Sequence, residues 1–265
     1  MIKTEKIPDG KQWAEEIARY ISRGMKTNFY GSAEEFLPEL EKIAKMEFEG
    51  GCYFFHEKEK QFDLYFFLEK GAKPAEFPEL DKPLVLEQVA VAKNPPALDE
   101  WEAVGFEKYL QRKRLFLSAK KTEAEERTVS FANLEEAETI LTMMEEAFEP
   151  YTSALPEREI LEQDISENRV IAVREGEELL GFLRFGREKK VSVLWQIVVA
   201  PNGRGKGIGT ALVKDWISLE REDVAKFQLW VREDNPPACK MYEALGFLPD
   251  GRIAPVMLKK YENEK

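Results

Sequence analysis

The chain has 265 residues, of which 43% are hydrophobic and 34% are charged, and its net charge is −11. This composition predicts a folded globular chain of one large or two ordinary domains, and it excludes a fibrous or generally disordered protein. No apolar run reaches the roughly 20 residues that a membrane helix needs. The first residues lack the apolar core of a signal peptide. The acidic balance argues against nucleic acid or an anionic membrane as the main partner.

Cysteine and histidine are scarce. Cys52 and Cys239 are the only cysteines, and His56 is the only histidine. Two cysteines so far apart give neither a disulfide framework nor a zinc-binding spacing, so we expect a reducing, cytoplasmic compartment and no metal site. A single histidine also disfavours Ser-His-Asp catalysis and any site built from several histidines. We expect His56 to lie in a loop.

The first half predicts two helices followed by strands. Helical patterns cover residues 10–25 and 33–45, and apolar runs predict strands at residues 52–55, 62–68, 84–91 and 113–117. The segment 119–127 is charged and almost free of apolar residues, which makes it the best linker candidate. The sequence therefore favours one domain at residues 1–122 and a second at residues 127–265.

The second half predicts alternating strands and helices. After a strand at 127–131, Asn133 and Glu136 form a capping box at the start of a helix over 134–148. Pro156 opens a second helix. The remaining elements are expected, in order, at 157–168 (that helix), 169–174, 179–187 and 191–200 (strands), 207–219 (helix), 227–231 (strand), then a short helix and a final hairpin. This order predicts an α+β fold with one mostly antiparallel sheet flanked by helices.

Residues 94–106 and 235–247 form an internal repeat at an offset of 141 residues, and eight of the 13 aligned positions are identical. Each copy begins with Asn-Pro-Pro and ends with Gly-Phe. Proline interrupts a strand ladder but can open a helix, and the glycine can end that helix in a left-handed cap. Each copy thus predicts a turn and a short helix between two strands, which favours the duplication of one module.

The segment 198–212 reads Val-Val-Ala-Pro-Asn-Gly-Arg-Gly-Lys-Gly-Ile-Gly-Thr-Ala-Leu, so a strand leads through glycines into a helix. Glycines let the backbone approach an anion closely, and the helix N-terminus adds unpaired N–H groups and partial positive charge. The loop predicts a pyrophosphate cradle to which Arg204 and Lys206 add charge. It lacks the Lys-Ser/Thr pair of a Walker A loop and the Gly-x-Gly-x-x-Gly spacing of a Rossmann fingerprint, so both of these nucleotide-binding readings are disfavoured.

The pattern Arg204-x-x-Gly207-x-Gly209 resembles the acetyl-CoA loop of the GNAT (GCN5-related) N-acetyltransferase superfamily. The block Asn235-x-x-Ala238-x-x-x-Tyr242-x-x-x-Gly246-Phe247 is similar to the second conserved block of that family. The full resemblance covers residues 127–265. The first half matches only the final block and the coarse element order, so it looks like a degenerate copy without a CoA loop. The resemblance implies two GNAT-like modules in tandem, with two splayed strands in the C-terminal module.

The resemblance also implies roles for individual residues. The pantetheine arm of acetyl-CoA would lie between the splayed strands, near Asn235, and pair with the backbone at Ile197, Val198 and Val199. The backbone N–H groups of the loop would hold the pyrophosphate, through Arg204, Gly205, Lys206, Gly207, Ile208, Gly209 and Thr210.

The reaction implied is direct attack of a primary amine on the thioester through a tetrahedral intermediate. A backbone N–H near Val199 would stabilise the oxyanion, and Tyr242 matches the general acid that protonates the leaving thiolate. The first half has Trp101 at the position aligned with Tyr242. We therefore expect that half neither to bind CoA nor to catalyse.

The motifs do not specify the general base or the acceptor pocket. Many relatives carry a glutamate on the strand before the loop, whereas residues 194–198 contain no carboxylate here. Glu162, Asp164 and Glu167 on the second helix are candidates, or a chain of water molecules, although a solvated helix face is the simpler expectation for these carboxylates. Tyr151 and Ser153 are candidates for the acceptor pocket, against a turn. Trp195 and Trp230 are expected to pack in the core.

The sequence thus predicts an acetyl-CoA-dependent N-acetyltransferase whose C-terminal module acts on a primary amine of a small molecule or peptide. The acidic composition favours a cationic acceptor by electrostatic steering. The alternative is a non-catalytic acyl-CoA-binding or regulatory module. No metal, nucleic acid or membrane partner is expected, and nothing in the sequence indicates an oligomeric state.

Overall fold

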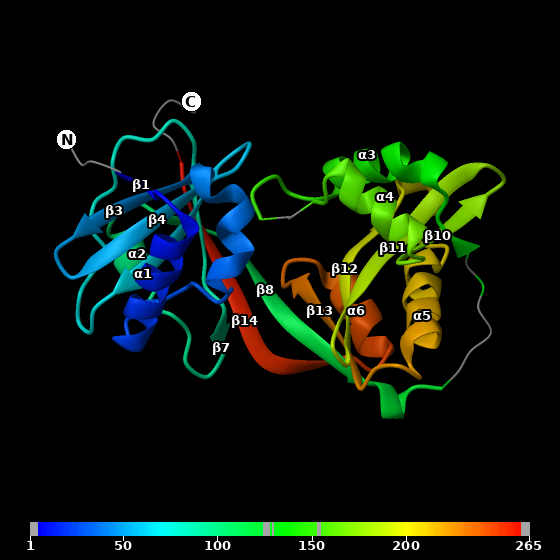
Figure 1. Ribbon diagram of the computed structural model, residues 1–265. Helices are drawn as coiled ribbons and strands as arrows, with labels where there is room; N and C mark the ends of the chain where they lie inside the picture. The colour runs from blue at the N-terminus through cyan, green and yellow to red at the C-terminus, as the bar shows by residue number, and fades with distance from the viewer. Residues whose placement is uncertain (1–4, 124–127, 129, 153–154, 261–265) are drawn as a thin grey trace. The chain divides into compact units, whose positions relative to one another are not determined.

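The computed structural model describes residues 5–123, 128, 130–152 and 155–260, and its contacts divide the chain into two compact units (Figure 1). The N-terminal unit comprises Met1–Gln111 and Ile253–Lys265, and the C-terminal unit comprises Arg112–Arg252. These bounds differ from the ranges 1–122 and 127–265, because β8 (Glu107–Ser118) and β14 (Leu248–Lys259) each pass from one unit into the other.

The sheet of the N-terminal unit has the strand order β1-β3-β4-β5-β6-β14. Its strands, besides the ends of β8 and β14, are β1 (Glu5–Lys6), β2 (Lys26–Thr27), β3 (Ile43–Phe48), β4 (Gly51–Glu57), β5 (Phe62–Leu68), β6 (Leu84–Glu87) and β7 (Ala90–Val91). Its helices are α1 (Gly10–Ser22), the 3₁₀ helix η1 (Ala33–Lys42) and α2 (Asp99–Glu102). The last strand of the chain completes this sheet, because Val256–Lys259 of β14 pairs antiparallel with β6.

Two expectations for the N-terminal unit are wrong. The helix predicted at 33–45 is a 3₁₀ helix that gives way to strand β3, because Pro38 lacks the N–H that a continuous α-helix needs at that point. His56, expected in a loop, is buried in β4. The expectation for α1 is confirmed, and the helix buries Trp13, Ile17 and Tyr20 against the sheet.

The sheet of the C-terminal unit has the order β8-β13-β12-β11-β10-β9. Its other strands are β9 (Ser130–Phe131), β10 (Val170–Glu175), β11 (Glu178–Glu188), β12 (Val191–Val199) and β13 (Lys226–Arg232). Its α-helices are α3 (Ala137–Ala147), α4 (Arg158–Ser166), α5 (Ile208–Glu220) and α6 (Pro236–Ala244), with short 3₁₀ helices η2 (Ala119–Lys121), η3 (Leu134–Glu136) and η4 (Pro201–Gly203). The linker expected at 119–127 lies partly outside the described residues.

Helices cover both faces of the C-terminal sheet. Along β11 the side chains of Phe182 and Leu183 point to opposite faces. Leu183 joins the core cluster that contains Trp216 of α5, whereas Phe182 joins the cluster that contains Met144 of α3 and Leu161 of α4. The capping box before α3 is confirmed, since the Asn133 N–H donates to Glu136 Oε2 at 2.7 Å.

The pairing between the parallel strands β12 and β13 ends halfway along β12, as expected for splayed strands. Their last paired residues are Leu194 and Leu229, although β12 runs on to Val199 and β13 to Arg232. The register between β11 and β12 shifts at the same point, which leaves Trp195 as the extra residue of a β-bulge. A bulge bends its strand and increases the local twist, so it turns the end of β12 away from β13.

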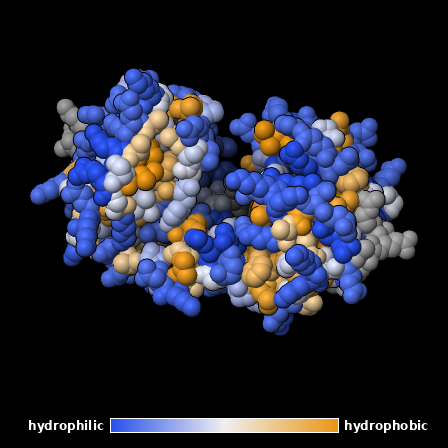
Figure 2. All heavy atoms as spheres, turned by 60° about the horizontal axis from the view of Figure 1, so that its bottom comes forward, coloured by the Kyte–Doolittle hydropathy of each residue, from blue (hydrophilic) through white to orange (hydrophobic). Residues whose placement is uncertain are grey.

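The expectation of a final hairpin is also wrong, because residues 248–259 form the single strand β14. Gly251, with φ of +82°, lies within this strand instead of closing a two-stranded turn. The face drawn in Figure 2 is largely hydrophilic, in keeping with the high share of charged residues. No helix among the described residues is long and apolar enough to cross a membrane.

Candidate functional site

The glycine-rich loop joins β12 to α5 and depends on glycine for two reasons. Gly205 and Gly207 have φ of +77° and +79°, and a Cβ at either would meet nothing within 4 Å. Backbone conformation, not crowding, favours glycine there, and the loop backbone is open to a ligand on that side. At Gly203, by contrast, a Cβ would lie 3.0 Å from Ile208 Cδ1 and 3.1 Å from the Leu180 oxygen, so a side chain there would be crowded.

The start of α5 presents unpaired donors. The helix has neither a side-chain cap nor an acidic residue in its first turn. Within the described part of the chain, no group accepts a hydrogen bond from the N–H groups of Gly205, Gly207, Ile208, Gly209 or Thr210. Arg204 is exposed, and Lys206 Nζ lies 3.0 Å from Glu175 Oε2 in an exposed ion pair. A helix N-terminus of this kind attracts a multiply charged anion such as pyrophosphate.

The end of β12 offers a backbone edge beside this loop. The Ala200 N–H donates to the Leu180 oxygen at 2.9 Å, toward β11. Because N–H directions alternate along a strand, the N–H groups of Val199 and Ile197 point the other way, into the fork that β13 has left open. The side chains of Ile197 and Val199 pack toward α5, whereas Val198 packs with α3 and α4.

Helix α6 brings Tyr242 to the same region. A Cβ on Gly209, in the first turn of α5, would lie 3.1 Å from Met241 Sδ, so the two helices are in contact at the loop. Asn235 caps α6, because its Oδ1 accepts from the Ala238 N–H at 3.2 Å. The structure gives Asn235 this capping role, and its expected place near the pantetheine stays a prediction.

Tyr242 is 3% exposed, and its ring meets Phe247 edge-on with centroids 5.6 Å apart. Burial raises the pKa of Tyr242 above its ordinary value, so the phenol is protonated at neutral pH. No group in the described residues hydrogen-bonds to its hydroxyl. The phenol therefore keeps its proton, and no described residue accepts it.

The three carboxylates considered as bases all form ion pairs. Asp164 is buried, contrary to the expected solvated face, and accepts from Arg184 Nε at 2.6 Å and Arg169 Nη1 at 3.1 Å. Glu162 pairs with Arg158 at 2.8 Å, and Glu167 pairs with Arg169. These contacts favour a structural role for each carboxylate.

Arg184 is a buried arginine beside the bulge that the sequence motifs did not indicate. Arg184 donates to Asp164 and, at 2.9 Å through Nη1, to Gln196 Oε1, and its guanidinium lies 4.5 Å from the centre of the Trp195 ring. The core expectation for Trp195 is wrong, because this side chain is 37% exposed. Trp230 is only half-buried. An alternating strand pattern hides these features, because a bulge resets which face each residue occupies.

Residues 137–247 match the family model described as the acetyltransferase (GNAT) family. This match covers most of the C-terminal unit. A GCN5-related N-acetyltransferase from Sphaerobacter thermophilus has a similar structure, with a TM-score of 0.66 and 16% identity over 98% of this chain and 96% of that one. A tandem GNAT protein from the clavulanic acid biosynthesis pathway aligns over 100% of both chains, with a TM-score of 0.58 and 12% identity. These two likenesses show the fold.

Among curated proteins, the UPF0157 protein YqkA of Bacillus subtilis is 30% identical over 82 residues. The match takes in 31% of this chain, and it spans only 24% of the length of that relative.

The two halves differ at the fork between their parallel strands. In the N-terminal unit β5 and β6 pair only at Phe62↔Leu84 and Asp63↔Val85. Beyond these pairs the buried Asn28 side chain bridges the strands. Its Nδ2 donates to the oxygens of Leu64 and Glu87 at 2.8 and 3.0 Å, and its Oδ1 accepts from the Phe66 N–H at 2.9 Å. Asn28 thus joins β5 and β6 beyond their last pair, whereas β12 and β13 have no backbone pairing beyond Leu194 and Leu229.

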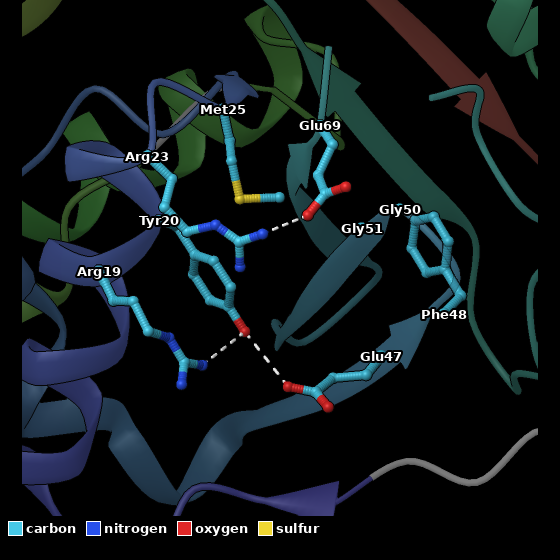
Figure 3. A pocket seen from close by; sticks show the side chains of 9 residues that line it. All are labelled: Arg19, Tyr20, Arg23, Met25, Glu47, Phe48, Gly50, Gly51 and Glu69. Atoms are coloured by element: carbon cyan, nitrogen blue, oxygen red, sulfur yellow. Dashed lines mark hydrogen bonds and ion pairs between the residues drawn. The ribbon is translucent and has the colours of Figure 1, made fainter. Parts of the chain in front are cut away.

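A separate pocket of about 240 Å³ lies in the N-terminal unit, between α1 and the β3–β4 turn (Figure 3). Its charged groups already have partners. The Tyr20 hydroxyl accepts from Arg19 and donates to Glu47, each at 3.3 Å, and Arg23 pairs with Glu69. It contains none of the GNAT motif residues. No cluster of His, Cys, Asp and Glu suited to a metal ion occurs in the described residues.

Proposed function

We propose that the C-terminal unit is an acetyl-CoA-dependent N-acetyltransferase that acetylates a primary amine of a small molecule or peptide. The observation that carries this proposal is the start of α5, whose unpaired N–H groups follow the outward-facing backbone of β12 from Ile197 to Val199. Helix α6, which carries the protonated Tyr242, contacts the first turn of α5 and supports the same proposal.

The residues present fit acetyl-CoA. The open backbone at Gly205 and Gly207, with the donors of Ile208, Gly209 and Thr210, suits a pyrophosphate. The loop side chains Arg204 and Lys206 add positive charge. The free edge at Ile197, Val198 and Val199 suits the amide groups of the pantetheine arm, near Asn235. When bound, acetyl-CoA supplies an acetyl group activated as a thioester.

Two groups of the chain then act on the reaction. The Val199 N–H points into the fork and can donate to the carbonyl oxygen as negative charge develops there. One such donor typically contributes about 3 kcal/mol to transition-state stabilisation. The Tyr242 hydroxyl donates its proton to the leaving sulfur, and the ordinary tyrosine pKa, raised further by burial, keeps that proton in place at neutral pH. Because Glu162, Asp164 and Glu167 are held in ion pairs, we assign proton removal from the amine to water.

We further propose that the N-terminal unit does not bind acetyl-CoA. Asn28 occupies the fork between β5 and β6, and the unit has neither the glycine-rich loop nor a phenol at the position of Tyr242. An indole has no transferable proton of useful acidity.

The alternative is a non-catalytic acyl-CoA-binding module, and the ion-paired carboxylates are the observation in its favour. Thiol release from acetyl-CoA, followed with a panel of amines, separates the two. Amine-dependent thiol release supports the transferase. Binding of acetyl-CoA without thiol release for any amine supports the binding module.

A further inference from the structure

Two tryptophan–arginine pairs flank the fork of the C-terminal unit. Leu194 and Leu229 are the last paired residues of β12 and β13, so Trp195 and Trp230 are the next residue on each strand. The Arg184 guanidinium lies 4.5 Å from the centre of the Trp195 ring, and that of Arg114 on β8 lies 5.7 Å from the Trp230 ring. Both distances are within the range of a cation–π contact.

Both indoles lie on the face of the sheet opposite α5. Phe227, Leu229 and Val231 join the core cluster under α5, so Trp230 between them faces the other side. Trp195 packs over Gly186, where a Cβ would lie 2.0 Å from the indole ring. Gly186 is on the same face of β11 as Arg184, which reaches Asp164 on α4.

The charge of each arginine is balanced. Arg184 pairs with Asp164, and Arg114 Nε donates to Asp250 Oδ2 at 2.7 Å. The surface beside the fork therefore presents aromatic rings whose neighbouring charges are neutralised. Stacking on a guanidinium also holds each ring in place, and a rigid aromatic surface loses little entropy when a ligand binds to it.

We propose that Trp195 and Trp230 form a platform that receives the acyl acceptor, a proposal that rests on the proposed function. The acceptor is then a primary amine that carries a flat aromatic group. The platform begins where β12 leaves β13, and the free edge from Ile197 to Val199 follows within a few residues. An aromatic group stacked there places its amine at the fork. The loop after α3 borders the same face, because Arg112 Nη1, on the side of β8 that carries Arg114, donates to the Thr152 oxygen at 3.4 Å.

This border bears on the expectation for Tyr151 and Ser153. Tyr151 lies in the loop next to Thr152, beside the platform. Ser153 lies outside the described residues. Because the guanidinium charges already have acidic partners, the platform selects by shape and stacking. A polycation such as a polyamine has no free carboxylate in these two pairs to bind.

The test compares amines of similar length in the thiol-release assay: phenethylamine and tryptamine against n-hexylamine and spermidine. We expect kcat/KM to be at least about tenfold higher for the aromatic amines. In Trp195→Ala and Trp230→Ala this preference falls about five- to tenfold through a rise in the amine KM, with the acetyl-CoA KM unchanged. Trp195→Phe retains most of the preference, and Ile160→Ala, at an exposed apolar residue of α4, serves as the control.

Equal use of aromatic and aliphatic amines, or a preference that survives both alanine substitutions, overturns the platform while leaving the transferase standing. If no amine is acetylated, the proposed function fails separately. Saturation-transfer NMR of tryptamine with the acetyl-CoA-loaded protein then decides the platform: a signal abolished by Trp195→Ala supports it, and an absent or unaltered signal overturns it.

Discussion

Trp101 and Tyr242 occupy the same position in the two copies of the repeated helix. Each is buried, with exposures of 0% and 3%, and each meets edge-on the phenylalanine five residues later, Phe106 or Phe247, at 5.8 and 5.6 Å. In each copy the N–H of that phenylalanine donates to the carbonyl of the aromatic residue, at 3.1 and 3.0 Å. The two halves thus share the architecture of this corner and differ in the chemistry of one side chain.

This pairing gives a matched test of the general acid. We expect Tyr242→Phe to lower kcat by about 100-fold or more, because the leaving sulfur loses its proton donor. Acetyl-CoA affinity and the melting temperature should stay close to those of the wild type, since no described residue hydrogen-bonds to the lost hydroxyl. Trp101→Phe is the control and should leave kcat unchanged. A full-speed Tyr242→Phe enzyme would remove Tyr242 from the mechanism.

The loop can be tested with two glycines of the same conformation. Gly207 and Gly251 have φ of +79° and +82°, and a Cβ at either would meet nothing within 4 Å. Alanine at either position should therefore destabilise the fold similarly, by about 1–2 kcal/mol. Only Gly207→Ala should weaken acetyl-CoA binding, by about tenfold in calorimetry, because only that residue lies in the proposed pyrophosphate cradle. Equal affinities for both variants would place the cradle elsewhere.

Asn28 should be essential to the N-terminal sheet. Asn28→Ala leaves the oxygens of Leu64 and Glu87 and the N–H of Phe66 without their partner, which we expect to cost about 2–4 kcal/mol. Faster hydrogen exchange of the Phe66 amide would report this locally. The control Asn202→Ala, which removes one exposed bond to Glu178, should change stability by less than about 0.5 kcal/mol.

The same feature predicts the binding stoichiometry. Because Asn28 fills the fork of the N-terminal unit, calorimetry should find one acetyl-CoA per chain for the wild type. Two equivalents per chain would contradict the closed fork.

The substitution Asp164→Asn tests whether Asp164 has a structural role or acts as the general base. It leaves the buried Arg184 guanidinium without its counter-ion, so we expect a loss of about 3–5 kcal/mol in the free energy of unfolding. Glu162→Gln breaks an exposed pair with Arg158 and should cost less than about 1 kcal/mol. An Asp164→Asn protein of normal stability but without turnover would instead identify Asp164 as the base.

His56 should make stability depend on pH. Burial, helped by the nearby charges of Lys58 and Lys42 and opposed by Glu39, lowers its pKa from 6.5 to about 4. Its contribution is then present above pH 6.5 and is lost as the pH falls toward 4, by at most about 3 kcal/mol, because the unfolded chain binds the proton more readily.

The pKa of the neighbouring Asp63 is raised to about 6, which opposes this trend in the same window. The wild type should therefore be compared with His56→Gln in urea denaturation at several pH values. The stability difference between the two should shrink from pH 6.5 to 4. A difference that does not vary with pH would rule out titration of His56 in this window.

Sequence patterns located most elements of the C-terminal unit to within a few residues, because its strands are apolar runs and its helices carry caps such as Asn133. They were less successful where neighbouring elements decide the outcome. Pro38 turned a helical pattern into a 3₁₀ helix followed by β3, and Gly251 sits inside a strand that looked like a turn. The bulge at Trp195 and the bridge made by Asn28 depend on pairing with distant strands, which the local sequence does not predict.

The exchange of β8 and β14 between the units bears on how the chain folds as it is made. The C-terminal unit is one continuous stretch of chain, but the N-terminal unit is made of two, so its sheet cannot be completed beside β6 until Lys259 has been synthesised. Until then the edge of β6 is exposed, and such an edge can pair with other chains. A ribosome-bound chain ending near residue 122 should therefore need a chaperone, although it already contains nearly all of the N-terminal core.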